Sequence, residues 1–340
     1  MSTIANPSGL SLSCHRVYTY TVPPEIISLI VEEFALPTYI VTRNNNGKKV
    51  KDPLPLPPPL RPILCKIRLL SKSFNDAASR LLFRRMVSKS GPLHFAFLRT
   101  IINSPHLAKY VRIYHTPTAD VRSGHVYGRI KKCLPLMTGL QELVYRKLEI
   151  PRDLSRSKPL PRHLPKVKKG KNMPFRLRSF VWFSERTRPD EDVQALEFIA
   201  TQASMQYLRW DSTRPLPSIH KDTIPQNLLY LDASVDTIVT ILPGRPSIEG
   251  IRWRSHDRAI LDHYSTADIN ELIRKLCRME QFHRLSFISL AGNYERSALK
   301  YLREQNAEPF PQLTTLALLT IDSSIVSVVQ VYLDSDLRHN

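Results

Sequence analysis

Residues with the chemistry for catalysis or metal binding are sparse in this sequence. The stretch HDRAILDHY, residues 256–264, offers two histidines and two aspartates, but His256 and His263 are seven positions apart, whereas chelating histidines on one helix are four apart. We interpret the stretch as a surface loop that passes into a helix. Neither a Gly-x-Ser-x-Gly elbow nor a glycine-rich phosphate loop occurs. The sequence therefore predicts a non-catalytic protein that needs no metal and no cofactor.

The cysteines and the start of the chain predict the compartment. Because Cys14, Cys65, Cys133 and Cys277 are widely scattered, they indicate neither a metal-ligand pair nor a disulfide framework, and we expect them to be reduced. Residues 1–16 lack the apolar run of a secretory signal, and no run reaches the roughly 18 apolar residues of a membrane helix. We expect a soluble protein of the cytoplasm, the nucleus or both, monomeric by itself and without membrane contact, with residues 1–16 disordered.

A second group of polar residues has the chemistry of a binding surface. Arginines, tyrosines and aspartates alternate with apolar residues in four short stretches, which contain Tyr207, Arg209 and Asp211, then Tyr230 and Asp232, then Arg252 and Arg254, and finally Arg284 and Ser286. Arginine forms paired hydrogen bonds with carboxylate and phosphate groups, so such a surface would suit an acidic or phosphorylated peptide of a protein substrate. The alternative is a solvated face that binds nothing.

These stretches belong to a repeated pattern, which predicts the strands that position them. The pattern apolar-x-x-apolar-x-apolar occurs eight times, and its last position is filled by Ile113, Tyr145, Trp182, Trp210, Ala233, Trp253, Phe287 and Leu318. All three tryptophans of the chain fall on this position. Because side chains alternate along a strand, the last two apolar residues of each unit share one face, and the residues that flank them point to the other.

Helical patterns lie between the predicted strands. Residues 190–203, 266–282 and 294–307 carry apolar residues at helical spacing, and we expect residues 323–335 to form a closing helix. A strand and a helix per unit is the plan of the leucine-rich repeat, although the units differ in length. We therefore predict an α/β fold: an irregular solenoid with a parallel sheet on its concave side. The alternative is an ordinary α/β domain whose buried strands share a motif.

The segment before the repeats predicts helices. Pro23 and Pro24 suit a first helical turn, Glu25 complements the helix dipole, and Ile26 and Ile30 are four positions apart. Residues 62–87 continue the helical spacing, and we expect Ser71 or Ser73 to divide them into two helices. These helices would at least cap the first repeat, in which case Ile26 and Ile30 belong to a core and need no partner.

This segment resembles the F-box family, of the type common in fungi that is followed by degenerate leucine-rich repeats. The resemblance is carried by Val22, Pro23, Glu25 and Ile26, and then by Leu69, Ser71, Lys72, Phe74, Asn75, Ala78, Leu81, Leu82, Phe83 and Arg84. It implies a three-helix module that docks on the adaptor subunit of a cullin-RING ubiquitin ligase, while the repeats bind a protein substrate. The adaptor-binding residues would be Pro23, Pro24, Glu25, Ile26, Ile27, Ile30, Leu70 and Phe74.

The sequence departs from the family in one place. Residues 35–61 separate the first two expected helices, and their six prolines and an Asn-Asn-Asn-Gly turn signal predict an extended, non-helical insertion. Lengthening a loop costs little, about 0.6 kcal/mol for each doubling, so the helical module tolerates such an insertion. Docking of the adaptor is impaired only if the insertion lies across the docking face.

The net charge of +19 is concentrated in one segment. Residues 151–178 contain ten Lys/Arg and one Asp and lack the interleaved aromatics that stack on bases. We interpret residues 151–174 as a solvated, disordered basic loop. Nuclear import through Lys166, Lys168, Lys169 and Lys171, or contact with nucleic acid or an acidic membrane, are the alternatives.

These observations predict two functional parts. Residues 17–90 form an F-box-like helical module with its insertion, and residues 91–340 form the repeat domain. The function that the F-box resemblance implies is substrate recognition within an SCF-type ubiquitin ligase. The alternative is a basic repeat scaffold that binds nucleic acid or acidic partners without any ligase.

Overall fold

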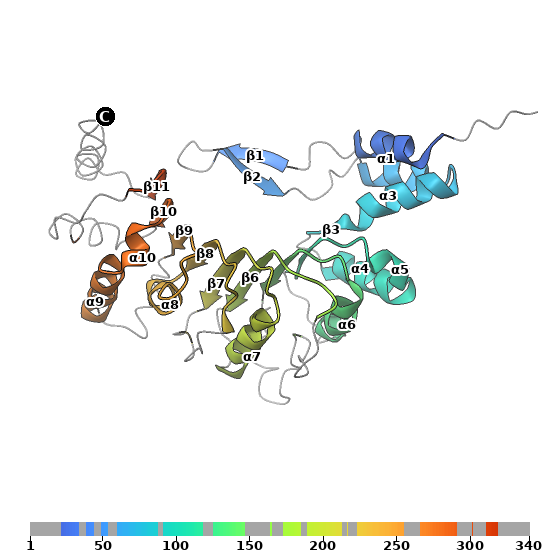
Figure 1. Cartoon of the computed structure of the whole chain (residues 1–340). Helices are drawn as coiled ribbons and strands as arrows, with labels where there is room; N and C mark the ends of the chain where they lie inside the picture. The colour runs from blue at the N-terminus through green and yellow to red at the C-terminus, as the bar shows by residue number, and fades with distance from the viewer. Residues whose placement is uncertain are drawn as a thin grey trace, which may run out of the picture.

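Within the part of the chain that the structure describes, the fold is α/β, with a sheet of nine parallel strands and a small helical unit at the N-terminal end (Figure 1). The computed structural model describes residues 22–33, 39–43, 49–53, 60–87, 91–117, 125–146, 164, 173–184, 189–212, 216, 223–254, 266–290, 301 and 311–318. None of the helices in these ranges is long and apolar enough to cross a membrane.

Three helices make up the N-terminal unit: α1 (Pro24–Glu33), α2 (Leu60–Ile67) and α3 (Lys72–Arg84). The predicted division of residues 62–87 is confirmed at Ser71, whose hydroxyl accepts a hydrogen bond from the Phe74 amide at 3.3 Å and so caps α3. The three helices share a small core of their own, formed by Ile27, Val31, Leu64, Ala77, Ala78, Leu81 and Leu82.

The insertion between α1 and α2 contains two paired strands. Strands β1 (Tyr39–Arg43) and β2 (Lys49–Pro53) are antiparallel, with Tyr39 opposite Pro53 and Arg43 opposite Lys49. The prediction of an extended, non-helical insertion is correct for these residues but missed their pairing, and α2 begins one residue before the insertion was expected to end. β-Branched residues such as Ile40, Val41 and Thr42 favour the strand conformation.

The main sheet is parallel throughout, and its strands follow one another in chain order. The strands are β3 (Arg85–Met86), β4 (Ile113–His115), β5 (Glu142–Arg146), β6 (Ser179–Ser184), β7 (Tyr207–Ser212), β8 (Tyr230–Ala233), β9 (Gly250–Trp253), β10 (Phe287–Leu290) and β11 (Thr315–Leu318). Because each strand pairs with the next one in the sequence, each strand-and-helix unit contacts mainly its neighbours.

The helices that connect the strands lie along one side of the sheet (Figure 1). They are α4 (Gly91–Asn103), α5 (Pro105–Ala108), α6 (His125–Cys133), the 3-10 helix η1 (Leu134–Leu136), α7 (Pro189–Ala200), α8 (Val235–Ile241), α9 (Thr266–Cys277) and α10 (Glu280–His283). Their apolar residues and one face of the strands form a single continuous core. The helices expected at 190–203 and 266–282 are present as α7 and α9, and their bounds lie within a few residues of the predicted ones.

The repeated apolar positions lie side by side in the sheet. Leu143, Phe180, Leu208, Leu231 and Ile251 are paired in register across β5 to β9 and are all buried. The last position of the pattern forms a second buried row in the same register. In that row the rings of Tyr145 and Trp182 stack at 5.2 Å, and those of Trp182 and Trp210 at 6.0 Å.

The shared row of tryptophans confirms the phasing of the central repeats. Trp253 occupies the same row, next to Ala233. A buried aspartate ties this row to a helix, because Asp192 of α7 accepts hydrogen bonds from Trp182 Nε1 at 2.9 Å and from Ser212 Oγ at 3.2 Å. Such bonds satisfy polar atoms that would otherwise be costly to bury.

In two of the eight units, the residue that pairs in the sheet lies three positions later in the sequence than predicted. Tyr114, not Val111, pairs with Leu143, and Ile288, not Leu285, pairs with Ile251. The predicted inward positions Ile113 and Phe287 are only partly buried. Val111 and Leu285 are also buried, although each lies before its strand begins. In both units an apolar residue three positions earlier therefore fits the pattern as well as the residue in the strand. Only the strand pairing shows which of the two belongs to the sheet.

Several predicted segments lie wholly or mostly outside the described residues. They are 1–16, the stretch 256–264, the helix at 294–307 apart from Tyr301, the closing helix at 323–335, and most of the basic loop 151–174. Leu164 of that loop is described, and it is buried in the main core. The interpretation of the whole loop as solvated is therefore wrong at this residue. Strand β3, for which no repeat unit was predicted, occupies Arg85–Met86, where the second of the two helices expected in 62–87 was to continue.

Candidate functional site

The sheet has a polar face, which we define as the side opposite the helices, formed by the residues that alternate with the buried rows. Three rows in register cross this face. The middle row contains Val144, Val181, Arg209, Asp232 and Arg252; the row before it contains Tyr207, Tyr230 and Gly250; and the row after it contains Arg146, Phe183 and Asp211.

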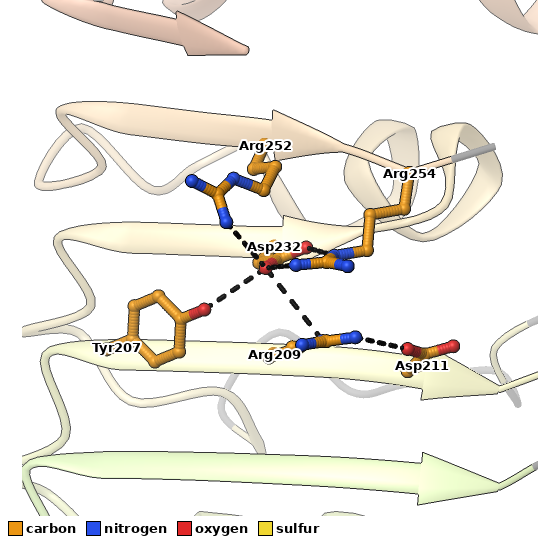
Figure 2. A network of polar contacts seen from close by, with 6 residues as sticks. All are labelled: Tyr207, Arg209, Asp211, Asp232, Arg252 and Arg254. Carbon is orange, nitrogen blue, oxygen red and sulfur yellow. Dashed lines mark hydrogen bonds and ion pairs between the residues drawn. The ribbon is translucent and has the colours of Figure 1, made fainter. Parts of the chain in front are cut away.

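Asp232 on β8 is the centre of a polar network on this face (Figure 2). Its side chain is 2% exposed and accepts two hydrogen bonds from Arg254, from Nε at 2.5 Å and from Nη2 at 2.9 Å. The Tyr207 hydroxyl donates a third bond at 3.1 Å. Two further guanidinium groups lie at ion-pair distance from Oδ2: Arg209 Nε at 3.9 Å and Arg252 Nη1 at 4.0 Å.

The pKa values of the partners reflect this buried carboxylate. Burial raises the pKa of the Tyr207 hydroxyl, and the charge and hydrogen bond of Asp232 raise it further, so Tyr207 stays protonated and acts as a donor. Burial acts to lower the pKa of Arg254, but the hydrogen bond and charge of Asp232, together with the charge of Asp211 and the effect of Tyr207, outweigh burial and raise that pKa. Arg209 on β7, Arg252 on β9 and Arg254, which directly follows β9, therefore surround one carboxylate.

A second part of the network lies on β5 and β6. The guanidinium groups of Arg146 and Arg209 both lie over the ring of Phe183, at 4.5 Å and 4.2 Å from its centroid. Arg209 also donates a hydrogen bond to Asp211 at 2.7 Å. Burial lowers the pKa of Arg146, and repulsion from Arg209 lowers it further, which indicates that positive charge is crowded at this point.

Gly250 makes room for an aromatic side chain on the polar face. A Cβ at this position would lie 2.7 Å from the ring of Tyr230 and 3.1 Å from Phe287. The ring of Tyr230 therefore lies against the backbone of β9, where no side chain intervenes, and it remains partly exposed. This places an aromatic surface beside the arginine network.

Most of the predicted substrate-binding residues lie together. Tyr207, Arg209, Asp211, Tyr230, Arg252 and Arg254 all belong to the polar face of β7, β8 and β9 or to the residue that directly follows β9. Asp232, which shares their alternation, is their common partner. The prediction from strand alternation therefore grouped these residues correctly, whereas their role in binding stays a prediction.

Arg284 does not belong to this group. It lies at the C-terminal cap of α10, before β10 begins, and its guanidinium pairs with Glu280 on the same helix. The prediction was wrong because the β10 unit is shifted by three residues, which also moves Ser286 out of the strand. The residues that the sequence analysis missed are Arg146 and Phe183, which the same alternation on β5 and β6 indicates.

The N-terminal unit presents a second candidate surface. Pro23, Pro24 and Glu25 are exposed, as are Ile26 and Ile30 at 45% and 43%. Leu70 is exposed after α2, and Phe74 is partly buried against the small core. Exposure of Ile26 and Ile30 contradicts the simple capping interpretation, which required them to be core residues.

Ile27 is a correction to the predicted adaptor-binding set. It is 4% exposed and packs inside the small core with Val31, one turn further along α1. The prediction failed because Ile26 and Ile27 are adjacent apolar residues, and only packing of α1 on α3 decides which of them turns inward. Four further apolar residues that are not in the predicted adaptor-binding set are exposed on this unit: Val22, Leu29, Ile63 and Leu69.

The structure also shows the surroundings of residues that could bind a metal or act as thiol nucleophiles. Within the part of the chain that the structure describes, no group of three or more His, Cys, Asp or Glu residues could hold a metal ion. Cys133 and Cys277 are buried, and desolvation raises the pKa of each thiol to about 12, so both are protonated at neutral pH. Cys65 is exposed.

Comparison with known proteins adds no further assignment. No protein-family model matches the chain, and no curated protein matches it significantly.

Proposed function

We propose that this protein is the substrate-recognition subunit of an SCF-type cullin-RING ubiquitin ligase. In this proposal α1 to α3 dock on the adaptor subunit, and the polar face of the sheet binds the protein that is to be ubiquitinated. The protein supplies no catalytic residue, and the ligase supplies the chemistry. The finer description of the fold, an F-box-like module followed by a leucine-rich-repeat-like solenoid, is part of the same proposal.

The observation that carries the proposal is the second apolar stripe on α1. Ile27 and Val31, four residues apart, turn into the small core, whereas Val22, Ile26, Leu29 and Ile30 are all exposed. The spacing of Ile26, Leu29 and Ile30 places these three along one side of α1, and Val22 lies just before the helix start. An amphipathic helix that leaves a second apolar stripe uncovered is suited to insertion into a groove of a partner.

The arrangement of the remaining chain supports the second half of the proposal. Nine strands in chain order, each beside the next, extend one continuous surface away from the helical unit. A partner protein bound to this surface would be held at a fixed position relative to a docked adaptor. Irregular spacing of the units, from 20 residues between Leu231 and Ile251 to 37 between Leu143 and Phe180, is compatible with a degenerate repeat.

The test is the affinity of the full chain for a purified ligase adaptor, measured by biolayer interferometry. The Ile26→Ala/Ile30→Ala variant is expected to bind at least about tenfold more weakly, which corresponds to roughly 1.4 kcal/mol. Leu93→Ala and Val193→Ala are matched controls, because these residues on α4 and α7 are equally exposed, at 45% and 42%, but lie away from the stripe. Their affinity should equal that of the unmodified protein.

A basic scaffold that binds nucleic acid is the second candidate, because ten of the Lys/Arg residues lie in 151–178. Binding of the adaptor that is equally strong in the double variant and in the controls would contradict the proposed docking surface. Retention of nucleic acid that weakens steeply with salt, together with no adaptor binding at all, would favour the scaffold.

A further inference from the structure

We propose that the polar face binds an acidic segment of a partner protein that carries two carboxylate side chains about three residues apart. Arg252 holds one carboxylate, and Arg146 together with Arg209 holds the other. This inference deepens the proposed function. Only the identification of the partner protein as a ligase substrate rests on that proposed function.

The first argument is the balance of charge. The middle row and the row after it, extended to Arg254, bring together four arginines, Arg146, Arg209, Arg252 and Arg254, but among the described residues only two aspartates, Asp211 and Asp232. The other carboxylate on this face, Glu142, is at the far end of β5 and pairs with His115 at 2.9 Å. The cluster therefore has two positive charges more than its own carboxylates neutralise.

The second argument is that the surplus charge is accessible and already positioned. Arg254 uses both its Nε and Nη2 on Asp232, so it is committed to the internal pair. Arg252 is different: its side chain is 44% exposed, and its ion pair with Asp232 is a long one at 4.0 Å. Arg252 lies at ion-pair distance from Asp232 and Arg146 lies over the Phe183 ring, so both guanidinium groups are near their binding positions before a ligand arrives, and less side-chain entropy is lost on binding.

The third argument is the distance between the two available sites. The Arg252 guanidinium reaches toward Asp232 on β8, whereas the Arg146 guanidinium lies over Phe183 on β6. Strands β6 and β8 are two spacings apart, or about 10 Å. An extended peptide covers this distance in about three residues. Two single negative charges at that separation fit the sites better than one compact group.

The chemistry of the centre selects carboxylates over phosphate and nucleic acid. A phosphate placed between the two sites would lie close to the buried carboxylate of Asp232, which repels a dianion more strongly than a single charge. Single-stranded nucleic acid binds by stacking successive bases on several open aromatic rings, and Phe183 cannot serve as one of them because it already carries two guanidinium groups. The exposed ring of Tyr230 remains free to contact an apolar residue of the bound segment.

The experiment is a selection of short random peptides, displayed on phage, against the full-length protein. Counter-selection uses the Arg146→Gln/Arg252→Gln variant, which keeps side-chain size and removes the proposed charges. Enriched peptides are then synthesised with a fluorescent label, and their dissociation constants are measured by anisotropy at low and high salt. Each peptide is compared with its amide version, in which Asp and Glu become Asn and Gln, and with a version that has one phosphoserine instead.

The expected result is enrichment of peptides with two acidic residues two to four positions apart. Arg252→Gln and Arg146→Gln should each weaken their binding at least about tenfold, and high salt should weaken it too. Arg274→Gln is the matched control, because Arg274 is an exposed arginine on α9 that pairs with Glu271, and its affinity should not change. Circular dichroism and thermal unfolding verify that each variant is folded.

Other outcomes overturn the proposal. These are the absence of acidic pairs among the enriched peptides, amide versions that bind equally well, and unchanged affinity for both arginine variants. Stronger binding of the phosphoserine version than of the acidic pair would replace the carboxylate assignment with a phosphate site. Because no adaptor is present, the result is independent of whether α1 docks on a ligase.

Discussion

At the scale of single residues, Asp232 determines how the polar face is organised. It is a buried carboxylate that receives hydrogen bonds from Arg254 and Tyr207 and lies within 4.0 Å of Arg209 and Arg252. A buried charge that loses its partner is far more costly than an exposed one, because the remaining charge has neither water nor counterion. Removal of the Asp232 carboxylate should therefore destabilise the protein more than removal of any one of the arginines.

We predict that Asp232→Asn destabilises the protein by about 3 kcal/mol, since it leaves Arg254 half buried without a counter-charge. Urea unfolding followed by circular dichroism measures this change. Arg252→Gln is the control, because the long contact of an exposed side chain is worth less than about 1 kcal/mol. Equal destabilisation by the two variants would contradict a buried network centred on Asp232.

Asp236, in the first turn of α8, gives a pH prediction. Burial raises the pKa of its carboxyl above the ordinary value of 3.8, although hydrogen bonds from Ser234 and nearby amides oppose the shift. The folded state therefore keeps the proton to a higher pH than the unfolded state. Stability from this group is fully present below the ordinary pKa and is lost as the pH rises through the raised value.

Asp236→Asn removes the titration and keeps an oxygen acceptor. We expect the variant to be more stable than the unmodified protein at neutral pH, with the difference shrinking as the pH falls toward about 4. Urea unfolding over a series of pH values tests this expectation. A difference that stays constant with pH would show that Asp236 titrates alike in both states.

At the scale of the elements, the strand positions follow from the sequence because alternation is a local property. A strand with one face in a core must place apolar residues at every second position, so the second and third apolar residues of each unit identify both the strand and its buried face. This was sufficient for β5 to β9. It failed for β4 and β10, where a buried residue at the end of the preceding helical segment has the same apolar character as the strand.

Gly250 on β9 provides a prediction for this scale. A methyl group there would meet the Tyr230 ring at 2.7 Å, so Gly250→Ala must displace that ring or the strand. We expect a loss of about 1 to 3 kcal/mol, the usual cost of overpacking, and a changed environment of Tyr230. Urea unfolding and near-ultraviolet circular dichroism measure the two effects.

Gly128→Ala is the matched substitution for comparison. Gly128 lies within α6, is exposed, and has nothing within 4 Å of a new Cβ. Alanine at this position should stabilise the protein by about 0.5 to 1 kcal/mol, because glycine is a poor helix former. Opposite signs for the two glycines are expected, and a Gly250→Ala variant as stable as the unmodified protein would contradict the close packing of Tyr230 on β9.

At the scale of the whole molecule, the chain has two unequal cores. The helical unit is held by seven buried residues, whereas the sheet and its helices share one continuous core. Phe83, at the end of α3, packs against both. The small unit buries little apolar surface, so its opening should require less free energy than opening of the sheet.

Amide hydrogen exchange followed by mass spectrometry tests this division. We predict that α1, α2 and α3 exchange faster than β5 to β9, because local opening of the small core leaves the large one intact. Addition of the ligase adaptor should slow exchange in α1 if the proposed docking is correct. Uniform protection of both regions would mean that the two cores open as one unit.

The sequence by itself determined the features that depend on neighbouring residues in the chain. These are the α/β class, the strand positions of β5 to β9, the row shared by the three tryptophans, and the grouping of Tyr207, Arg209, Arg252 and Arg254. Each follows from a period of two or of three to four residues, which is set by backbone geometry and needs no distant contact.

Only the tertiary structure decided which of two equivalent residues turns inward and which strands bring charges together. Burial of Ile27 beside exposed Ile26 depends on how α1 packs on α3, and the placement of Arg284 outside the sheet depends on the register of β10 with β9. The convergence of Arg146, Phe183 and Arg209 from three strands likewise requires the parallel pairing. The periodicity of a sequence specifies which face of a helix or strand is apolar, whereas contacts between the elements specify which side chains meet.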